Sequence, residues 1–163
     1  MNEEINQTLP SQRLAGMGVK LPPVAKPVAD YVPALTTAGQ IFTSGQLPFI
    51  DGKLALTGKV GAEVSLEEAA NAARTACLNA LAAAAGQAGG IDGIQRVVKL
   101  TVYVASAPDF TAQPTVANGA SAVLTEVLGP QGQHTRSAVG VAVLPLNSPV
   151  EVELILESNA ASF

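Results

Sequence analysis

The sequence has few of the residues on which most protein chemistry depends. Charged residues make up 13% of the chain and aromatic residues 4%, with no tryptophan, one cysteine and one histidine. A single cysteine excludes an internal disulfide, and one histidine with one cysteine cannot form an ordinary structural zinc site. No Gly-Xaa-Gly-Xaa-Xaa-Gly run and no P-loop is present. We therefore expect no metal and no cofactor.

Positive charge is scarce and dispersed. The formal net charge is −4, and Lys and Arg form no cluster. Nucleic-acid and anionic-membrane surfaces need clustered Lys and Arg, so we expect neither kind of partner. No apolar run reaches transmembrane length, and the N-terminus lacks the pattern of a signal peptide. These features favour a cytoplasmic protein.

The low share of charge also bears on assembly. The chain has 163 residues, 48% of them apolar, which fits one domain. Globular proteins devote about a quarter of their residues to charge. The deficit favours a surface that is partly covered by other subunits. Cys77 stands among alanines at helical spacing, so we interpret it as a small buried residue rather than a reactive thiol.

Hydrophobic periodicity and turn residues predict the order β-β-α-β-α-β-β. Ser65 to Glu68 forms a capping box, which predicts a helix that extends to about Ala85. A second helix is expected at 114–128, capped by Asp109 or Thr111. Strands are expected at 31–37, 40–44, 94–105, 136–144 and 149–157. This order predicts an α+β fold with one sheet and both helices packed on one face.

Three other segments carry weaker signals. Residues 3–17 have apolar residues at helical spacing (Ile5, Leu9 and Leu14), although Pro10 weakens or splits that helix. The proline-rich segment 19–30 reads as an extended connector, and Asp51-Gly52 predicts a turn in the loop 49–64. The strand 94–105 shows little alternation, so we expect both of its faces to be covered.

Arg136 begins an apolar strand in a chain that has few charges. Strand alternation gives it small neighbours on its own face: Ala138, Gly140 and Ala142. Such neighbours leave room for a helix or a ligand. Two interpretations of the guanidinium are equally supported. It binds a substrate carboxylate as a bidentate pair, or it forms a salt bridge with Glu151 or Glu153 on the next strand.

Other candidate groups lie close to this strand. Glu151, Glu153 and Glu157 share one face of the last strand, and a solvated strand face is the simpler interpretation. His134 follows a Gly-rich segment and is interpreted as a surface residue more readily than as a catalytic one. No Gly-Xaa-Ser-Xaa-Gly elbow marks a serine nucleophile.

Three short motifs occur in a fixed order. They are Thr-Ser-Gly-Gln-Leu-Pro at 43–48, Arg-Ser-Ala-Val at 136–139 with Leu-Pro at 144–145, and Val-Glu-Val-Glu at 150–153. Together they resemble the Rid family, the reactive intermediate deaminases also called YjgF-type or L-PSP proteins. The resemblance covers about residues 28–157. It implies a chorismate-mutase-like α+β fold, a homotrimer with clefts between subunits, and cofactor-free hydrolysis of enamines and imines such as 2-aminoacrylate to 2-keto acids and ammonia.

The resemblance also implies roles for single residues. Arg136 corresponds to the arginine that binds the substrate carboxylate, and Glu151 to the acidic residue that orients the attacking water. The positions that correspond to the substrate-binding residues are Tyr31, Ser44, Gly45, Asn118 and Ala138. Proton transfer by Glu151 through water would be general acid–base catalysis.

The chain departs from the family pattern at several points. Ala138 stands where many members have cysteine, and Gly140 stands at an acidic position. Residues 1–27 form an N-terminal extension before a single domain at 28–163, and the loop 49–64 is long, so we expect a longer subgroup. Three functions are weighed: an imine or enamine hydrolase on small carboxylates, a non-catalytic binder of such acids, and a ribonuclease or translation inhibitor. The acidic net charge disfavours the last.

Overall fold

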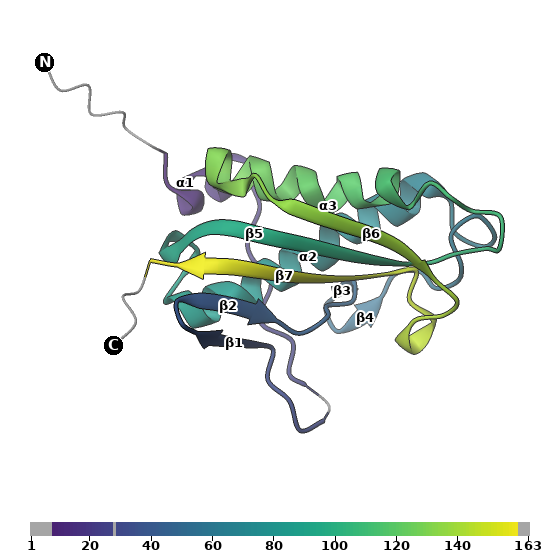
Figure 1. Cartoon of the computed structure of the whole chain (residues 1–163), viewed down its shortest axis with the longest axis horizontal. Helices are drawn as coiled ribbons and strands as arrows, with labels where there is room; N and C mark the ends of the chain where they lie inside the picture. The colour runs from purple at the N-terminus through teal and green to yellow at the C-terminus, as the bar shows by residue number, and fades with distance from the viewer. Residues whose placement is uncertain (1–7, 28, 160–163) are drawn as a thin grey trace, which may run out of the picture.

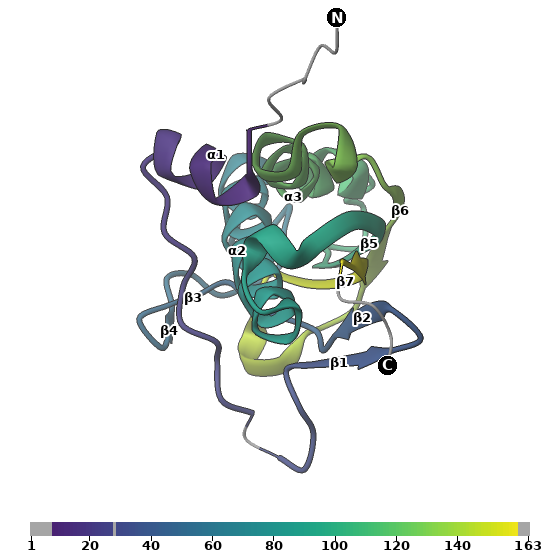
Figure 2. The ribbon, with the colours of Figure 1, turned by 90° about the vertical axis from the view of Figure 1, so that its left-hand side faces the viewer.

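A computed structural model describes residues 8–27 and 29–159, and it shows a five-stranded sheet with helices on one face (Figures 1 and 2). The sheet has the strand order β1-β2-β7-β5-β6. The strands are β1 (Ala34–Thr37), β2 (Gln40–Thr43), β5 (Ile94–Ala105), β6 (Thr135–Val141) and β7 (Val150–Ser158). The long helices are α2 (Leu66–Ala88) and α3 (Gln113–Leu128). This arrangement confirms the predicted α+β fold.

The pairing of the strands places β6 at an edge of the sheet. β5 pairs antiparallel with β7 and parallel with β6, and β2 pairs antiparallel with β1 and β7. α3 connects β5 to β6 and lies over them (Figure 1). Any side chain of β6 that points toward the helices therefore lies close to α3.

The predicted capping box of α2 is confirmed. The Ser65 hydroxyl accepts a bond of 3.2 Å from the Glu68 amide, and the Glu68 carboxylate accepts one of 2.8 Å from the Ser65 amide. Small residues let α2 and α3 pack closely, because a Cβ at Gly119 would collide with the Ala70 carbonyl. Cys77 is buried, as predicted, and burial raises the pKa of its thiol.

The start of α3 differs from the prediction. Neither Asp109 nor Thr111 caps it, because the N-cap residue is Ala112, which has no side-chain cap. The Gln113 side chain instead donates to the Phe110 carbonyl at 2.8 Å. The cap prediction was therefore wrong, since a side chain from inside the helix holds the preceding turn.

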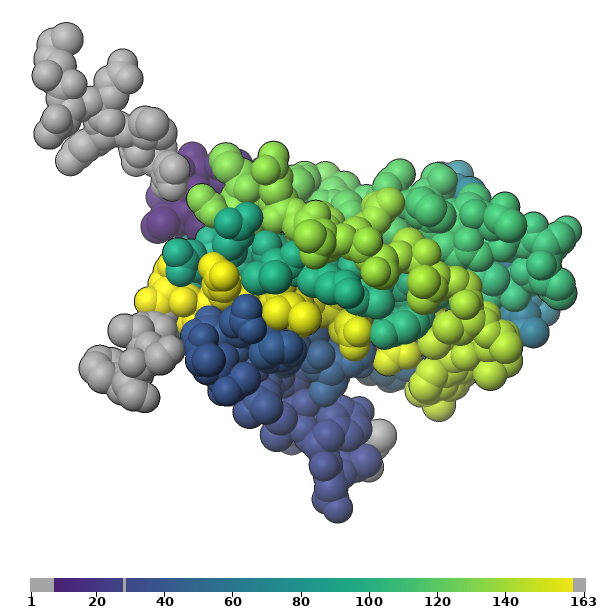
Figure 3. All heavy atoms as spheres, in the orientation of Figure 1, coloured from purple at the N-terminus to yellow at the C-terminus, as the bar shows by residue number. Residues whose placement is uncertain are grey.

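One face of β5 is fully buried in the described protomer, and the other is only partly covered. Val97, Leu100 and Val102 are buried beneath the helices, whereas Thr101 and Tyr103 on the opposite face are only half-buried. Figure 3 views this opposite face and shows β5 and β7 at the surface. We call it the open face of the sheet. Among the described residues no second layer packs on this face, so the expectation that both faces are covered is not met within one protomer.

The N-terminal segment is fastened to the domain. α1 (Pro10–Gly16) begins at a proline, which suits the first turn of a helix, and buries Leu14. Ser11 bonds the Asp92 carboxylate of η1 (Ile91–Gly93) through its amide at 2.8 Å and its hydroxyl at 2.6 Å. The predicted position Ile5 lies outside the described residues. The connector then runs extended past α2 (Figure 2).

Four short elements complete the fold. β3 (Phe49–Ile50) and β4 (Lys53–Leu54) form a hairpin around the predicted turn at Asp51-Gly52. η2 (Gly129–Gly132) precedes β6, and η3 (Pro145–Asn147) precedes β7. Within the described ranges, no helix combines the length and the hydropathy that a membrane crossing needs.

Candidate functional site

Arg136 lies on the helix-covered side of the edge strand β6. It pairs with Leu100, which is fully buried beneath the helices, so the two side chains share that face. Its Nη1 donates to Asn118 Oδ1 at 2.8 Å and to Ser121 Oγ at 3.1 Å, both on α3. The side chain is exposed. Because both acceptors are neutral and only one nitrogen is used, Nε and Nη2 keep their donors for an anion.

Glu151 lies on the open face of the sheet. It pairs with Tyr103, whose side chain lies on the same face. The Glu151 carboxyl is half-buried, and burial, followed by the nearby charge of Glu153, raises its pKa. A carboxyl with a raised pKa exchanges protons more readily near neutral pH, which suits acid–base chemistry.

Gly45 leaves space for the Glu151 carboxylate. A Cβ at Gly45 would collide with Glu151 Oε1. The two residues are held together because Gln46 and Val152 exchange backbone hydrogen bonds of 2.7 and 2.9 Å. The close approach, rather than an unusual backbone angle, explains why glycine suits this position.

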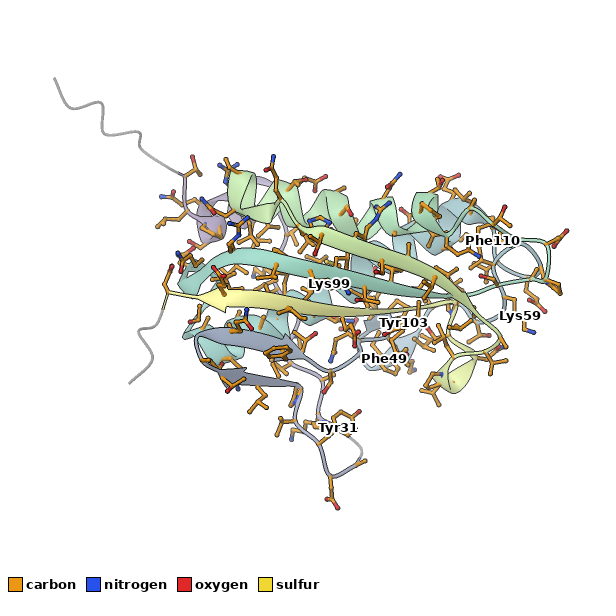
Figure 4. All side chains as sticks on the ribbon, in the orientation of Figure 1. Tyr31, Phe49, Lys59, Lys99, Tyr103 and Phe110 are labelled. Carbon is orange, nitrogen blue, oxygen red and sulfur yellow. The ribbon has the colours of Figure 1, made fainter. Side chains whose placement is uncertain are left out.

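Ser44 holds the loop that carries Tyr31. Its hydroxyl donates to the Val32 carbonyl at 2.6 Å, and its amide donates to the Pro33 carbonyl at 2.8 Å. Tyr31 is 52% exposed and lies on the loop before β1 (Figure 4). Tyr31, Gly45 and Glu151 together line a pocket of about 320 Å³. The Ser44 hydroxyl hydrogen is thus used in a bond to the backbone. Its oxygen can only accept a further hydrogen bond.

The predicted site residues, together with Ser121, which only the structure reveals, form two groups within one protomer. One group, called here the arginine group, consists of Arg136, Asn118 and Ser121. The other, called the glutamate group, consists of Tyr31, Gly45 and Glu151. Register places the two on opposite faces of the sheet. For this reason Arg136 cannot form a salt bridge with Glu151 or Glu153 of its own protomer, which was the alternative interpretation.

The comparisons with known proteins decide the family. A family described as YjgF/chorismate mutase-like, putative endoribonuclease, matches residues 11–158. The chain belongs to this family. Protein TCP17 of Trypanosoma cruzi is 42% identical over 90% of this chain and 92% of its own length. The protein Atu1372 of Agrobacterium tumefaciens, of unknown function, is 42% identical with a TM-score of 0.84, covering 91% of this chain and 92% of its own.

A more distant member differs more in shape. TdcF of Escherichia coli, crystallised with bound serine, is 26% identical with a TM-score of 0.58, covering 84% of this chain and 93% of its own. The higher TM-score with Atu1372 agrees with the expectation of a subgroup within this YjgF-like family. The boundary expected between residues 27 and 28 stays a prediction, although the family match already includes most of α1.

Ala138 and Gly140 are the two positions on β6 where the chain departs from the family pattern. Ala138 is partly buried and packs against the core beneath α3, on the same face as Arg136. Gly140 lies beside Gln113, whose amide nitrogen would be 2.8 Å from an added Cβ. Among the described residues, no three His, Cys, Asp or Glu side chains gather as metal ligands would.

Sequence reasoning missed several residues near the two groups. Glu153 is not a simple solvated charge, because its carboxylate accepts a bond of 2.9 Å from the Tyr103 hydroxyl. That bond raises the pKa of Tyr103. Asn79 is buried on α2 and donates to the carbonyls of Leu47 and Phe49 at 2.9 and 3.1 Å, which fixes one wall of the pocket. No local pattern distinguishes such residues from their neighbours in the sequence.

Proposed function

We propose that this protein hydrolyses the enamine and imine forms of small 2-amino acids, such as 2-aminoacrylate, to 2-keto acids and ammonia. The observation that carries the proposal is the exposed Arg136 guanidinium, which two neutral acceptors hold through one nitrogen. A fixed guanidinium fork with free donors is suited to a substrate carboxylate. Membership of the YjgF-like family and the serine bound to TdcF support the same class of ligand.

We further propose that the protein acts as a homotrimer and that each cleft combines two protomers. The arginine and glutamate groups lie on opposite faces of one sheet, so one protomer cannot present both to one small molecule. The open face also carries exposed apolar side chains at Leu35, Phe42 and Val139. If the open faces of different protomers packed against one another, this apolar surface would be buried. The β6 edge of one protomer would then lie beside Glu151 of its neighbour.

The chemistry requires a bound anion and an activated water. Arg136 holds the carboxylate, so the imine carbon lies at a fixed distance from the clamp. The imine reacts in its protonated form, and Glu151 accepts a proton from water as the oxygen attacks that carbon, which gives a neutral carbinolamine. Glu151 then passes this proton to the nitrogen. As the C–N bond breaks, the carbinol hydroxyl gives its own proton back to Glu151, which leaves a 2-keto acid and ammonia. For an enamine substrate, protonation of the terminal carbon first produces the imine.

Two other functions compete with this proposal. A non-catalytic binder would use the same Arg136 without turnover. The family description names a putative endoribonuclease. RNA binding draws most of its affinity from cationic side chains near phosphates, and the net charge of −4 and the three carboxylates of the open face (Glu151, Glu153 and Glu157) oppose it.

The decisive assay generates 2-aminoacrylate in situ from serine with a dehydratase and follows pyruvate and ammonia. We expect the protein to release both faster than buffer does. Saturable binding of pyruvate, with no acceleration of pyruvate and ammonia release, would instead establish a non-catalytic binder. RNA cleavage that survives repurification and disappears in a cleft variant would establish the ribonuclease.

Gly45→Ala tests the close approach to Glu151. The added Cβ must displace the Glu151 carboxylate, and misplacement of a catalytic group by about 1 Å can cost about 100-fold in rate. We expect kcat to fall by roughly that factor while the unfolding temperature changes little. Gly16→Ala is the matched control, because its Cβ would meet no atom within 4 Å. Equal activity of the Gly45→Ala and Gly16→Ala proteins would mean that Gly45 and Glu151 do not belong to the reacting centre.

A further inference from the structure

His134, the single histidine of the chain, is half-buried and makes two hydrogen bonds, against the expectation of a surface residue. Its Nδ1 lies 2.6 Å from the Gly132 carbonyl oxygen, and its Nε2 lies 2.9 Å from Ser121 Oγ. A carbonyl oxygen can only accept, so Nδ1 carries the hydrogen. In the neutral ring, Nε2 is then the acceptor, and the Ser121 hydroxyl donates to it.

These bonds form a directed chain that ends at Arg136. Ser121 Oγ gives its one hydrogen to His134 and accepts from Arg136 Nη1 at 3.1 Å. The hydroxyl would otherwise rotate freely, and the imidazole fixes which of its lone pairs faces the guanidinium. Each donor in the series is used once, and bonds in such a series strengthen one another.

The far end of the chain is fixed to the backbone. Gly132 is buried at the end of η2, and a Cβ there would collide with the backbone of Leu124 on α3. This close packing places the Gly132 carbonyl that anchors His134. The same helix carries Ser121 and Asn118, so both acceptors of Arg136 and the anchor of the imidazole depend on α3.

We propose that Ser121 and His134 are positioning residues that hold the Arg136 guanidinium with Nε and Nη2 directed toward the substrate carboxylate. The inference rests on the proposed function of Arg136 but concerns its orientation. Asn118 is exposed and supplies one acceptor, which alone leaves a long side chain free to rotate about that bond. The second acceptor, directed by His134, removes that rotation. Both residues therefore act on substrate affinity and not on the chemical step.

The first test is a long-range ¹H–¹⁵N spectrum of the untagged protein, in which the single histidine gives one set of ring signals. We expect the neutral ring to carry its hydrogen on Nδ1 and to have an unprotonated Nε2. A ring protonated at Nε2, or an equal mixture of the two forms, would overturn the directed chain. This measurement needs no substrate, so its outcome does not depend on the proposed reaction.

The second test separates binding from turnover. Ser121→Ala is expected to raise KM about tenfold with kcat nearly unchanged, because a bond to a charged group is lost before the chemical step. His134→Phe, which keeps a ring but no acceptor, should raise KM in the same direction by less. Ser121→Thr keeps the hydroxyl, so its KM should stay close to that of the wild type. Thr125→Ala, one turn along α3, is the control and should change neither constant.

The outcomes distinguish this inference from the proposed function. If the wild type shows no turnover, the reaction fails, and the dissociation constant for pyruvate, measured by calorimetry, replaces KM. A tenfold weaker affinity in Ser121→Ala supports the positioning role in either case. Unchanged affinity in a Ser121→Ala variant with native circular dichroism overturns it, as does a loss confined to kcat.

Discussion

Arg136→Ala is expected to lower kcat/KM for 2-aminoacrylate by about 10²- to 10⁴-fold. The substitution removes two charge-assisted hydrogen bonds to the carboxylate, each worth about 1.5–3 kcal/mol, and about 1.4 kcal/mol corresponds to a tenfold change. The fold should survive, because the Arg136 side chain is exposed and buries no charge. The measurements are the rate of pyruvate release and the affinity for pyruvate, which should fall together.

Two further variants serve as comparisons for Arg136→Ala. Arg136→Lys keeps the charge but not the planar fork, so it should recover only part of the lost affinity. Arg74→Ala removes another arginine, whose surface ion pair with Glu126 at 2.9 Å contributes at most about 1 kcal/mol. That control should keep full activity. Equal rates for Arg136→Ala and the wild type would contradict the assignment of the carboxylate clamp.

Glu151→Gln is expected to lower kcat by about 10²- to 10⁴-fold and to leave pyruvate affinity nearly unchanged, because the amide cannot take a proton from water. The same change should raise the unfolding temperature at neutral pH. Burial and Glu153 raise the pKa of Glu151 in the folded state, so the ionised carboxylate costs stability there. A loss of activity together with a gain of stability is typical of a group kept for function.

The rise in unfolding temperature expected for Glu151→Gln should depend on pH, and that dependence tests the direction of the pKa shift. A raised folded pKa means that the protonated carboxyl favours the fold, and this stability is lost as pH rises through the folded pKa. Glutamine resembles the protonated form at every pH, so the difference in unfolding temperature should appear above the raised pKa and vanish in acid. Glu153→Gln removes a neighbouring charge, lowers the pKa of Glu151 and should shift the acid limb of activity to lower pH. A shift to higher pH would contradict the assigned cause.

Local chemistry in the sequence was sufficient for most of the fold. Ser65 and Glu68 cap α2 as their spacing predicts, because a capping box depends only on residues three apart. The start of α3 could not be predicted in this way. A helix begins there without a capping side chain, since Gln113 holds the turn from inside the helix.

The two groups of the site differ in how far sequence could locate them. Strand alternation showed that Arg136 has small neighbours, but not that α3 supplies Asn118 and Ser121 as its acceptors. That contact depends on the rotation of a helix about its axis. His134 was misread because its bonds depend on the turn of η2, which packs against Leu124. Opposite faces for Arg136 and Glu151 follow from register, which one strand alone does not reveal.

The most direct test of a cleft shared by two protomers mixes the Arg136→Ala and Glu151→Gln proteins. The two inactive variants are unfolded together, refolded at equal concentration, and assayed for pyruvate release. If each cleft takes Arg136 from one protomer and Glu151 from its neighbour, random assembly restores about one quarter of the clefts and about one quarter of wild-type activity. Either variant refolded alone should stay inactive. Mixed trimers with no recovered activity, confirmed by mass spectrometry, would contradict the shared cleft.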